Sequence, residues 1–167
     1  KNWFKLTGIL NGIDVESYNP SKDAALFAPF SAEDLENKKV CKTELQKMLG
    51  LPVKDVPMIA MITRLVSHKG LDLVKAVAED ILHEDVQFVL LGTGDTAYEE
   101  FFKDLAKRYE GKTSVNIAFN GALSRQIYAG SDIFLMPSIS EPCGLSQMIC
   151  SRYATVPVVR ETGGLYD

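Results

Sequence analysis

The sequence predicts an α/β fold, a doubly wound sheet of parallel strands with helices on both faces. From residue 56 onward, short apolar runs alternate with segments whose apolar residues recur at helical spacing. The apolar runs are continuous, as expected for strands that are buried on both faces. Strands separated by helices pair in parallel through right-handed crossovers, so these runs should form one sheet.

The elements of this sheet follow one another without a long break. Strands are expected at residues 56–64, 86–94, 114–119, 132–137 and 156–160. Helices are expected between them, at residues 69–82, 98–109, 124–131 and 145–154. Short connections of this kind are typical of a compact α/β unit.

Residues 1–55 have a different pattern. Residues 9–23 are rich in Asn, Gly, Asp and Pro and predict a loop, whereas residues 37–51 predict a helix that stops at Gly50. We assign residues 1–55 to a lead-in loop and helix of the same structural unit, and residues 56–167 to its α/β core. The sequence stops just after a glycine pair that should open another element, so we expect it to belong to a longer protein.

The composition excludes several classes of protein. The chain has 167 residues, 46% of them apolar, which suits one globular domain. A net charge of −4 argues against a nucleic-acid surface. No apolar run approaches the roughly 20 residues of a membrane span, and no signal peptide is visible. The cysteines, Cys41, Cys143 and Cys150, form no CxxC motif and predict reduced thiols, not a metal site.

Unusual residues gather where the predicted strands end, which is where open parallel sheets bind ligands. Arg64 and Lys69 share the loop after the first strand, and this loop opens a helix. Two cations and free backbone N–H groups can hold phosphate without a metal, although solvated surface charges are an alternative. Glu141 follows the fourth strand, and a helix opens at Gly144. No Walker motif or complete dinucleotide fingerprint is present, so the residues alone predict a diphosphate-binding α/β domain.

Five segments resemble the glycogen and starch synthases of bacteria and plastids. They are LNGIDVESYNP, ITRLVSHKGLDLV, FVLLGTGD, SDIFLMPSISEPCGLSQM and YATVPVVRETGGLYD, and together they cover essentially the whole chain in the expected order. The synthases are retaining glucosyltransferases of the two-lobed GT-B architecture. The chain is similar to their C-terminal, Rossmann-like, nucleotide-sugar-binding lobe, and the N-terminal lobe with most of the acceptor groove is not in this sequence.

The resemblance implies a role for each matching residue. Arg64 and Lys69 would hold the donor diphosphate, and Glu141 would contact the donor sugar. Further residues implied in substrate binding are Phe119, which would pack on the base, Cys143 and the helix start Gly144, Leu145 and Ser146, and the second glycine loop Thr162, Gly163 and Gly164. Many GT-B enzymes have a second Glu where this chain has Ile149, so the contacts to the ribose stay unassigned, with Gln147 nearby.

The resemblance also implies the reaction, which is transfer of glucose from ADP-glucose to the non-reducing end of an α-1,4-glucan with retention. The preference for ADP over UDP rests on the family alone. No metal or other cofactor is expected, and the expected partners are the donor, the glucan and the N-terminal lobe, without nucleic acid or membrane. The expected compartment is the bacterial cytoplasm, or a plastid in a plant.

Four alternatives stay open at this point. The chain could belong to another retaining GT-B transferase such as a sucrose-type synthase, although EPCGLSQM argues against that. It could bind nucleotide sugar without activity in isolation. A phosphorylase-like enzyme would need a lysine that bears pyridoxal, for which Lys69 is conceivable. Glu141 could also act only as the cap of the helix that opens at Gly144, although Glu is not a preferred capping residue.

Overall fold

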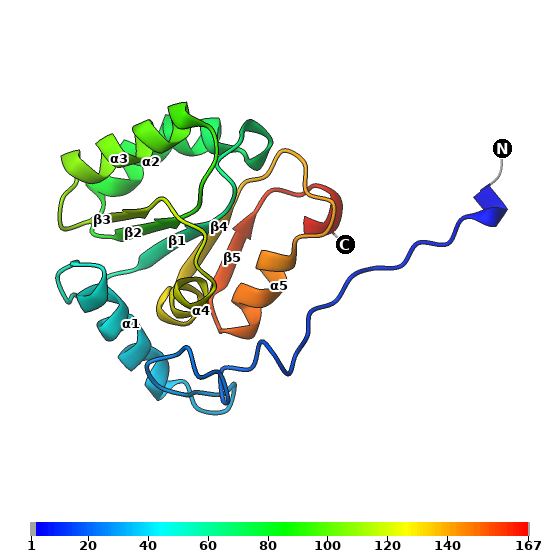
Figure 1. Cartoon of the computed structure of the whole chain (residues 1–167), viewed down its shortest axis with the longest axis horizontal. Helices are drawn as coiled ribbons and strands as arrows, with labels where there is room; N and C mark the ends of the chain where they lie inside the picture. Colours follow the sequence, from blue (N-terminus) through cyan, green and yellow to red (C-terminus); the bar gives the residue numbers. More distant parts are fainter. Residues whose placement is uncertain (1–2, 167) are drawn as a thin grey trace.

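The computed structural model describes residues 3–166 and contains one sheet of five parallel strands (Figure 1). The strand order is β3-β2-β1-β4-β5. The strands are β1 (Met58–Ile62), β2 (Gln87–Leu91), β3 (Thr113–Asn116), β4 (Ile133–Met136) and β5 (Val156–Val159). The prediction of a doubly wound parallel sheet is confirmed. Residues 1–2 of the predicted lead-in and residue 167 of the predicted α/β core lie outside the described residues.

Helices cover both faces of the sheet, as Figure 1 shows. On one face lie α2 (Leu71–His83) and α3 (Thr96–Arg108), and on the other lie α4 (Gly121–Gly130) and α5 (Leu145–Arg152). The lead-in helix α1 (Glu36–Met48) packs against α4. The chain thus winds from β1 to β3 along one face and returns through β4 to β5 along the other, which is the doubly wound arrangement.

Four helices begin one to three residues away from the prediction, and for α2 and α4 the difference has a local cause. The helix predicted from residue 124 begins at Gly121, because the Asn120 side chain accepts a hydrogen bond from the Leu123 N–H at 3.0 Å and caps the helix. The helix predicted from residue 69 begins at Leu71. Ser67–Lys69 form a separate 3-10 turn instead, and Gly70 joins the two at a φ of 74°. Lys69 therefore lies outside α2, in the turn before it.

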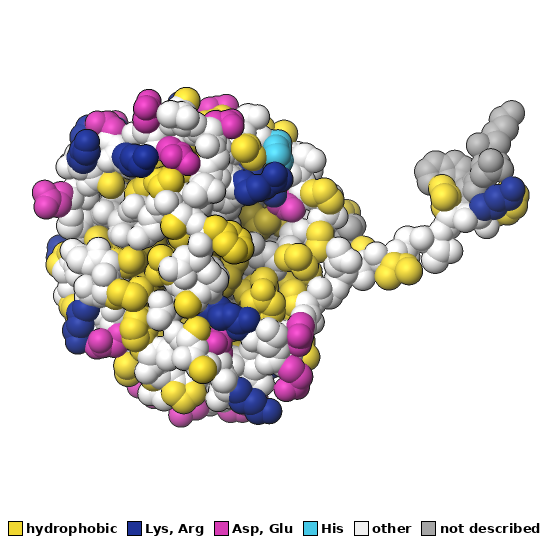
Figure 2. All heavy atoms as spheres, in the orientation of Figure 1, with side chains coloured by type: hydrophobic (Ala, Val, Ile, Leu, Met, Phe, Trp, Pro, Cys, Tyr) yellow, Lys and Arg dark blue, Asp and Glu magenta, His cyan; other side chains and the backbone are white. Residues whose placement is uncertain are grey.

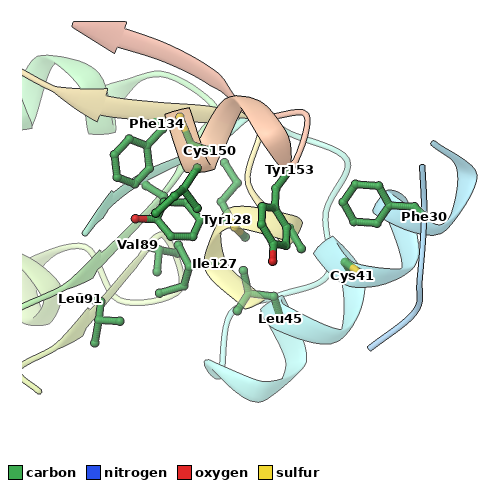
Figure 3. Close-up of a cluster of buried hydrophobic side chains, with 14 of the residues drawn as sticks. Phe30, Cys41, Leu45, Val89, Leu91, Ile127, Tyr128, Phe134, Cys150 and Tyr153 are labelled. Carbon is green, nitrogen blue, oxygen red and sulfur yellow. The ribbon is translucent and has the colours of Figure 1, made fainter. Parts of the chain in front are cut away.

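The core consists of one apolar cluster on each face of the sheet. The cluster beneath α4 and α5 includes Tyr128, Phe134 and Tyr153, whose rings lie close together in Figure 3. From α1, Leu45 and Cys41 enter the same cluster and are fully buried. The lead-in helix is thus part of the same hydrophobic core as the strands, because removing it would expose this cluster to water.

The lead-in loop before α1 has a docked part and an extended part. Arg125 of α4 binds the docked part, because its Nη1 donates to Asp23 Oδ2 at 2.8 Å. Residues 4–12 extend away from the fold as an arm (Figure 1). The arm carries exposed apolar side chains, as Figure 2 shows; these are Phe4, Leu6, Ile9 and Leu10.

Helix α1 ends as predicted, at a left-handed glycine. Gly50 has a φ of 70°, and its N–H donates to the Lys47 carbonyl at 3.1 Å. The next N–H, that of Leu51, reaches back to the Gln46 carbonyl at 2.8 Å. This is a Schellman motif, which satisfies two of the free carbonyls at the helix end.

Helix α5 ends in the same motif, but Ala154 occupies the left-handed position with a φ of 54°. A Cβ at this φ is strained, and the Ala154 side chain is exposed and loses little packing when removed. We expect Ala154→Gly to raise the free energy of unfolding by about 0.5–1 kcal/mol. Urea denaturation measures the change.

The matched control is Gly50→Ala, which introduces the same strain where nothing lies within 4 Å of an added Cβ. It should lower the free energy of unfolding by a similar amount. A destabilising Ala154→Gly would contradict the strain argument.

Candidate active site

The candidate site lies where the strand order reverses, between β1 and β4. Such a switch point opens a crevice outside the carboxyl ends of the strands. Two adjoining cavities lie there, one of about 460 Å³ and one of about 230 Å³. They share the residues that follow β1 and those that open α5, which makes them one continuous groove; the shared residues are Ile62, Thr63, Arg64, Leu145 and Ser146.

The smaller cavity contains an ion pair between two of the predicted residues. The Lys69 ammonium lies 2.6 Å from Glu141 Oε2, and the two side chains are only 16% and 9% exposed. The sequence predicted Lys69 for the diphosphate, and the fold also places it on the carboxylate. Since an ammonium group has three N–H donors, Lys69 can hold Glu141 and still face a second anion.

The backbone explains why these two loops meet. A Cβ on Gly70 would lie 2.0 Å from the Pro137 carbonyl oxygen, so only glycine allows the turn after β1 to pack on the end of β4. The His68 carbonyl also accepts a hydrogen bond from the Ile139 N–H at 2.9 Å. These contacts carry Lys69 to the loop that contains Glu141.

Glu141 does not cap the helix that follows it. The N-cap residue of α5 is Gly144, at a φ of 79°, and no side chain caps this helix end. The Glu141 carboxylate instead accepts hydrogen bonds from Lys69 and from the Ser138 hydroxyl. The capping alternative is therefore wrong, and the carboxylate faces the cavity.

The second glycine loop packs behind Glu141. The Gly164 N–H donates to the Glu141 carbonyl at 2.8 Å, and Thr162 Oγ1 donates to the Ile139 carbonyl at 3.3 Å. A Cβ on Gly163 or Gly164 would lie 2.3 Å from the carbonyl oxygen of Glu141 or Cys143, respectively. Neither cavity is lined by this loop. Its predicted contact with a donor stays a prediction, while its backbone fixes the position of the Glu141 segment.

The larger cavity has an aromatic rim and a charged wall. The Phe119 ring, predicted to pack on a base, is 99% exposed at this rim. Tyr18 and Arg125 line the cavity as well, with the Arg125 guanidinium 4.6 Å from the centre of the Tyr18 ring. Neither residue was predicted for the site, because they lie over 100 positions apart, and nothing in the segment LNGIDVESYNP, which contains Tyr18, indicates a contact with Arg125.

Burial and hydrogen bonds shift the pKa values of two groups beside this cavity. Burial raises the pKa of Tyr128 to about 12, further above physiological pH than the ordinary pKa of tyrosine, and the neutral hydroxyl can donate a hydrogen bond. Burial alone would also raise the pKa of Asp23, but hydrogen bonds from Tyr153 and Arg125 outweigh it and lower that pKa. Asp23 therefore stays anionic and keeps Arg125 in place.

The fold brings most of the predicted site residues together. Those that line the smaller cavity are Arg64, Lys69, Glu141, Cys143, Gly144, Leu145 and Ser146. The Cys143 thiol also accepts a hydrogen bond from the Asn11 side chain at 3.1 Å, which ties the base of the arm to the cavity. Among residues 3–166, no group of three or more His, Cys, Asp or Glu side chains could hold a metal ion.

Comparison with known proteins identifies the family. The sequence profile described as "Glycosyl transferases group 1" matches residues 43–167, about three quarters of the chain. The chain belongs to the group 1 glycosyl transferases. As a member of this family it is 58% identical over 163 residues to the glycogen synthase of Kosmotoga olearia, and 55% identical over 163 residues to that of Geobacillus stearothermophilus.

One solved structure is closely similar to the structure of this chain. The catalytic domain of starch synthase IV from Arabidopsis thaliana, solved bound to ADP and acarbose, is 42% identical with a TM-score of 0.90. The match covers 96% of this chain and 34% of that one. The two bacterial relatives are matched over 98% and 97% of this chain and 34% of their own length. The chain thus spans about a third of the length of these relatives.

These matches confirm the resemblance to glycogen and starch synthases, and they confirm that the chain has the Rossmann-like fold of one lobe of the GT-B architecture. The Anabaena protein HepE, solved with UDP and glucose, is 19% identical with a TM-score of 0.64, which shows a shared fold alone. Across residues 3–166, no helix is long and apolar enough to cross a membrane.

Proposed function

We propose that this chain forms the donor-binding part of a glycogen or starch synthase, which transfers glucose from ADP-glucose to the non-reducing end of an α-1,4-glucan with retention. The observation that carries the proposal is one groove that holds, along its length, the exposed Phe119 ring, the Arg64 side chain and the Lys69–Glu141 pair. The similarity to a starch synthase solved with ADP and acarbose supports the choice of donor and acceptor.

The dimensions and lining of the groove suggest how the donor lies in it. The larger cavity suits the nucleoside, because Phe119 offers the face of its ring to a base. The smaller cavity suits the glucosyl group, because it contains the Glu141 carboxylate. Arg64 lines both cavities, and its exposed side chain makes no ion pair with the residues that the structure describes. It is free to bind the diphosphate between them.

The charges of this groove are arranged as glucosyl transfer requires. The transition state develops positive charge at the anomeric carbon and negative charge on the departing diphosphate. Glu141 would stabilise the first, while Arg64, Lys69 and the N–H groups at the start of α5 would stabilise the second. With cations already supplied by side chains, the proposed reaction needs no metal. We favour electrostatic stabilisation by Glu141 over covalent attack, because Glu141 is the one carboxylate among the described residues that line the smaller cavity.

The remaining partners in this proposal are the glucan and an N-terminal lobe that would close over the donor. An enzyme that consumes ADP-glucose would work in the bacterial cytoplasm or, in a plant, in a plastid. The similarity to glycogen synthases and to a starch synthase supports both parts of this proposal.

The isolated chain should bind ADP and ADP-glucose weakly and transfer no glucose. The groove residues lie on this chain, but one lobe cannot exclude water from the donor. Calorimetry or NMR titration should give a Kd on the order of 0.1–1 mM for ADP. Adding EDTA should leave this Kd unchanged.

The control variant is Phe119→Ala, which removes the stacking face from an exposed position and should weaken ADP binding without lowering stability. Glycogen elongation by the purified chain would contradict the expected inactivity. Failure to bind ADP at millimolar concentration would overturn the proposed function.

A further inference from the structure

The two oxygens of the Glu141 carboxylate have different surroundings. Oε2 accepts a hydrogen bond from Lys69 Nζ at 2.6 Å and another from Ser138 Oγ at 3.2 Å. Oε1 accepts none from the residues that the structure describes, and it belongs to a side chain that lines the smaller cavity. One oxygen is therefore fixed by the protein, and the other is left to meet a ligand.

The position of the Ser138 backbone and the burial of its side chain both direct its hydroxyl to that oxygen. It is 1% exposed and follows Pro137, the residue on which Gly70 packs without room for a Cβ. A buried hydroxyl is costly unless it is paired, and within residues 3–166 the Ser138 hydroxyl makes its one side-chain hydrogen bond to Glu141. Alanine would fill the same space without a buried hydroxyl, so the serine at this position is explained by its hydrogen bond to the Glu141 carboxylate.

Lys69 alone would leave the carboxylate free to turn. The terminal torsion of Glu is broad, and a single ammonium can follow either oxygen as the group rotates. Two donors on one oxygen, one from the 3-10 turn after β1 and one from the loop after β4, define which oxygen faces the cavity. A hydrogen bond to a charged group is strong enough to select one rotamer.

We propose that Ser138 is a positioning residue, which holds Glu141 Oε2 beside Lys69 so that Oε1 points at the donor sugar. The inference rests on the proposed function, since it needs a sugar in the smaller cavity. It assigns Ser138 no contact with the donor. Its effect on the sugar should therefore depend entirely on the Glu141 carboxylate.

The test compares ADP with ADP-glucose on this chain, because only the second ligand has a sugar for Glu141 to contact. Ser138→Ala should weaken ADP-glucose binding about threefold or more and change ADP binding by less than about 1.5-fold. Glu141→Ala, which removes the acceptor that Ser138 holds, should weaken ADP-glucose binding by about tenfold or more. In the double variant, Ser138→Ala should add nothing to the effect of Glu141→Ala.

The matched control is Ser140→Ala in the same loop, whose side chain is exposed, and it should change neither affinity. If Ser138→Ala reduced the affinity for ADP-glucose equally with and without the Glu141 carboxylate, the positioning role would be overturned. Equal weakening of ADP and ADP-glucose would overturn it as well, since it would show a general disturbance of the site. If the unsubstituted chain did not bind ADP at all, the proposed function would be overturned, and this inference with it.

Discussion

Glu141→Gln is expected to lower kcat by at least roughly a hundredfold while ADP still binds almost normally. Gln keeps the shape of the side chain and an oxygen that can accept from Lys69 and Ser138, but it loses the charge. That charge matters most when the anomeric carbon becomes positive. The measurement needs a second lobe, so kcat is compared in a chimaera in which this chain replaces the matching segment of the Kosmotoga olearia glycogen synthase.

Two further measurements separate chemistry from stability in this experiment. The melting temperature of Glu141→Gln should fall by no more than about 3 °C, because the hydrogen bonds are retained. Cys143→Ser should reduce kcat far less, since its thiol lines the cavity without carrying charge. A Glu141→Gln protein that melts several degrees lower and yet turns over normally would refute the catalytic role.

Arg64→Ala and Lys69→Ala should each cost about 2–4 kcal/mol of transition-state stabilisation, measured as kcat/KM for the donor in the same chimaera. The structure predicts that the two variants differ in stability. Arg64 is exposed and forms no ion pair with the described residues, so its loss should leave the melting temperature unchanged. Loss of Lys69 leaves the nearly buried Glu141 carboxylate without its cation, so this variant should also melt at a lower temperature.

Arg160→Ala is the control for a general loss of positive charge. Arg160 follows β5 at the same edge of the sheet, is exposed, and lines neither cavity. It should keep both kcat/KM and the melting temperature. If kcat/KM fell less than tenfold for both Arg64→Ala and Lys69→Ala, the phosphate assignment would be wrong.

The sheet could be predicted from the sequence because its signals are local. Each strand is a short apolar run, and parallel topology follows from the helices between them. The residues at the strand ends were predicted for the same reason, since Arg64 and Glu141 lie in the loops that follow β1 and β4. Topology then brings these strand ends to one crevice.

Most of the contacts that could not be predicted depend on long-range packing. Nothing near Lys69 in the sequence indicates that a 3-10 turn will direct it to Glu141, 72 residues later. The contact of Ser138 with Glu141 is local, but it could not be predicted either, because a serine three residues before an acid is an ordinary loop sequence. The wall formed by Tyr18 and Arg125 requires the lead-in loop to fold back on α4, and no periodic pattern encodes that.

The docking of the lead-in loop has a consequence for the order of events during synthesis on the ribosome. Asp23 meets Arg125 across 102 residues, and Lys38 donates to Thr155 across 117 residues. At roughly 5–20 residues per second, Asp23 and Lys38 wait on the order of 5–20 s for these partners to be synthesised. During that interval the lead-in has no partner residues against which it can dock. Early-stalled nascent chains should therefore be cut by protease within the docked part of the lead-in, residues 13–35, and chains stalled beyond β5 should be protected there, whereas the exposed arm should be cut in both.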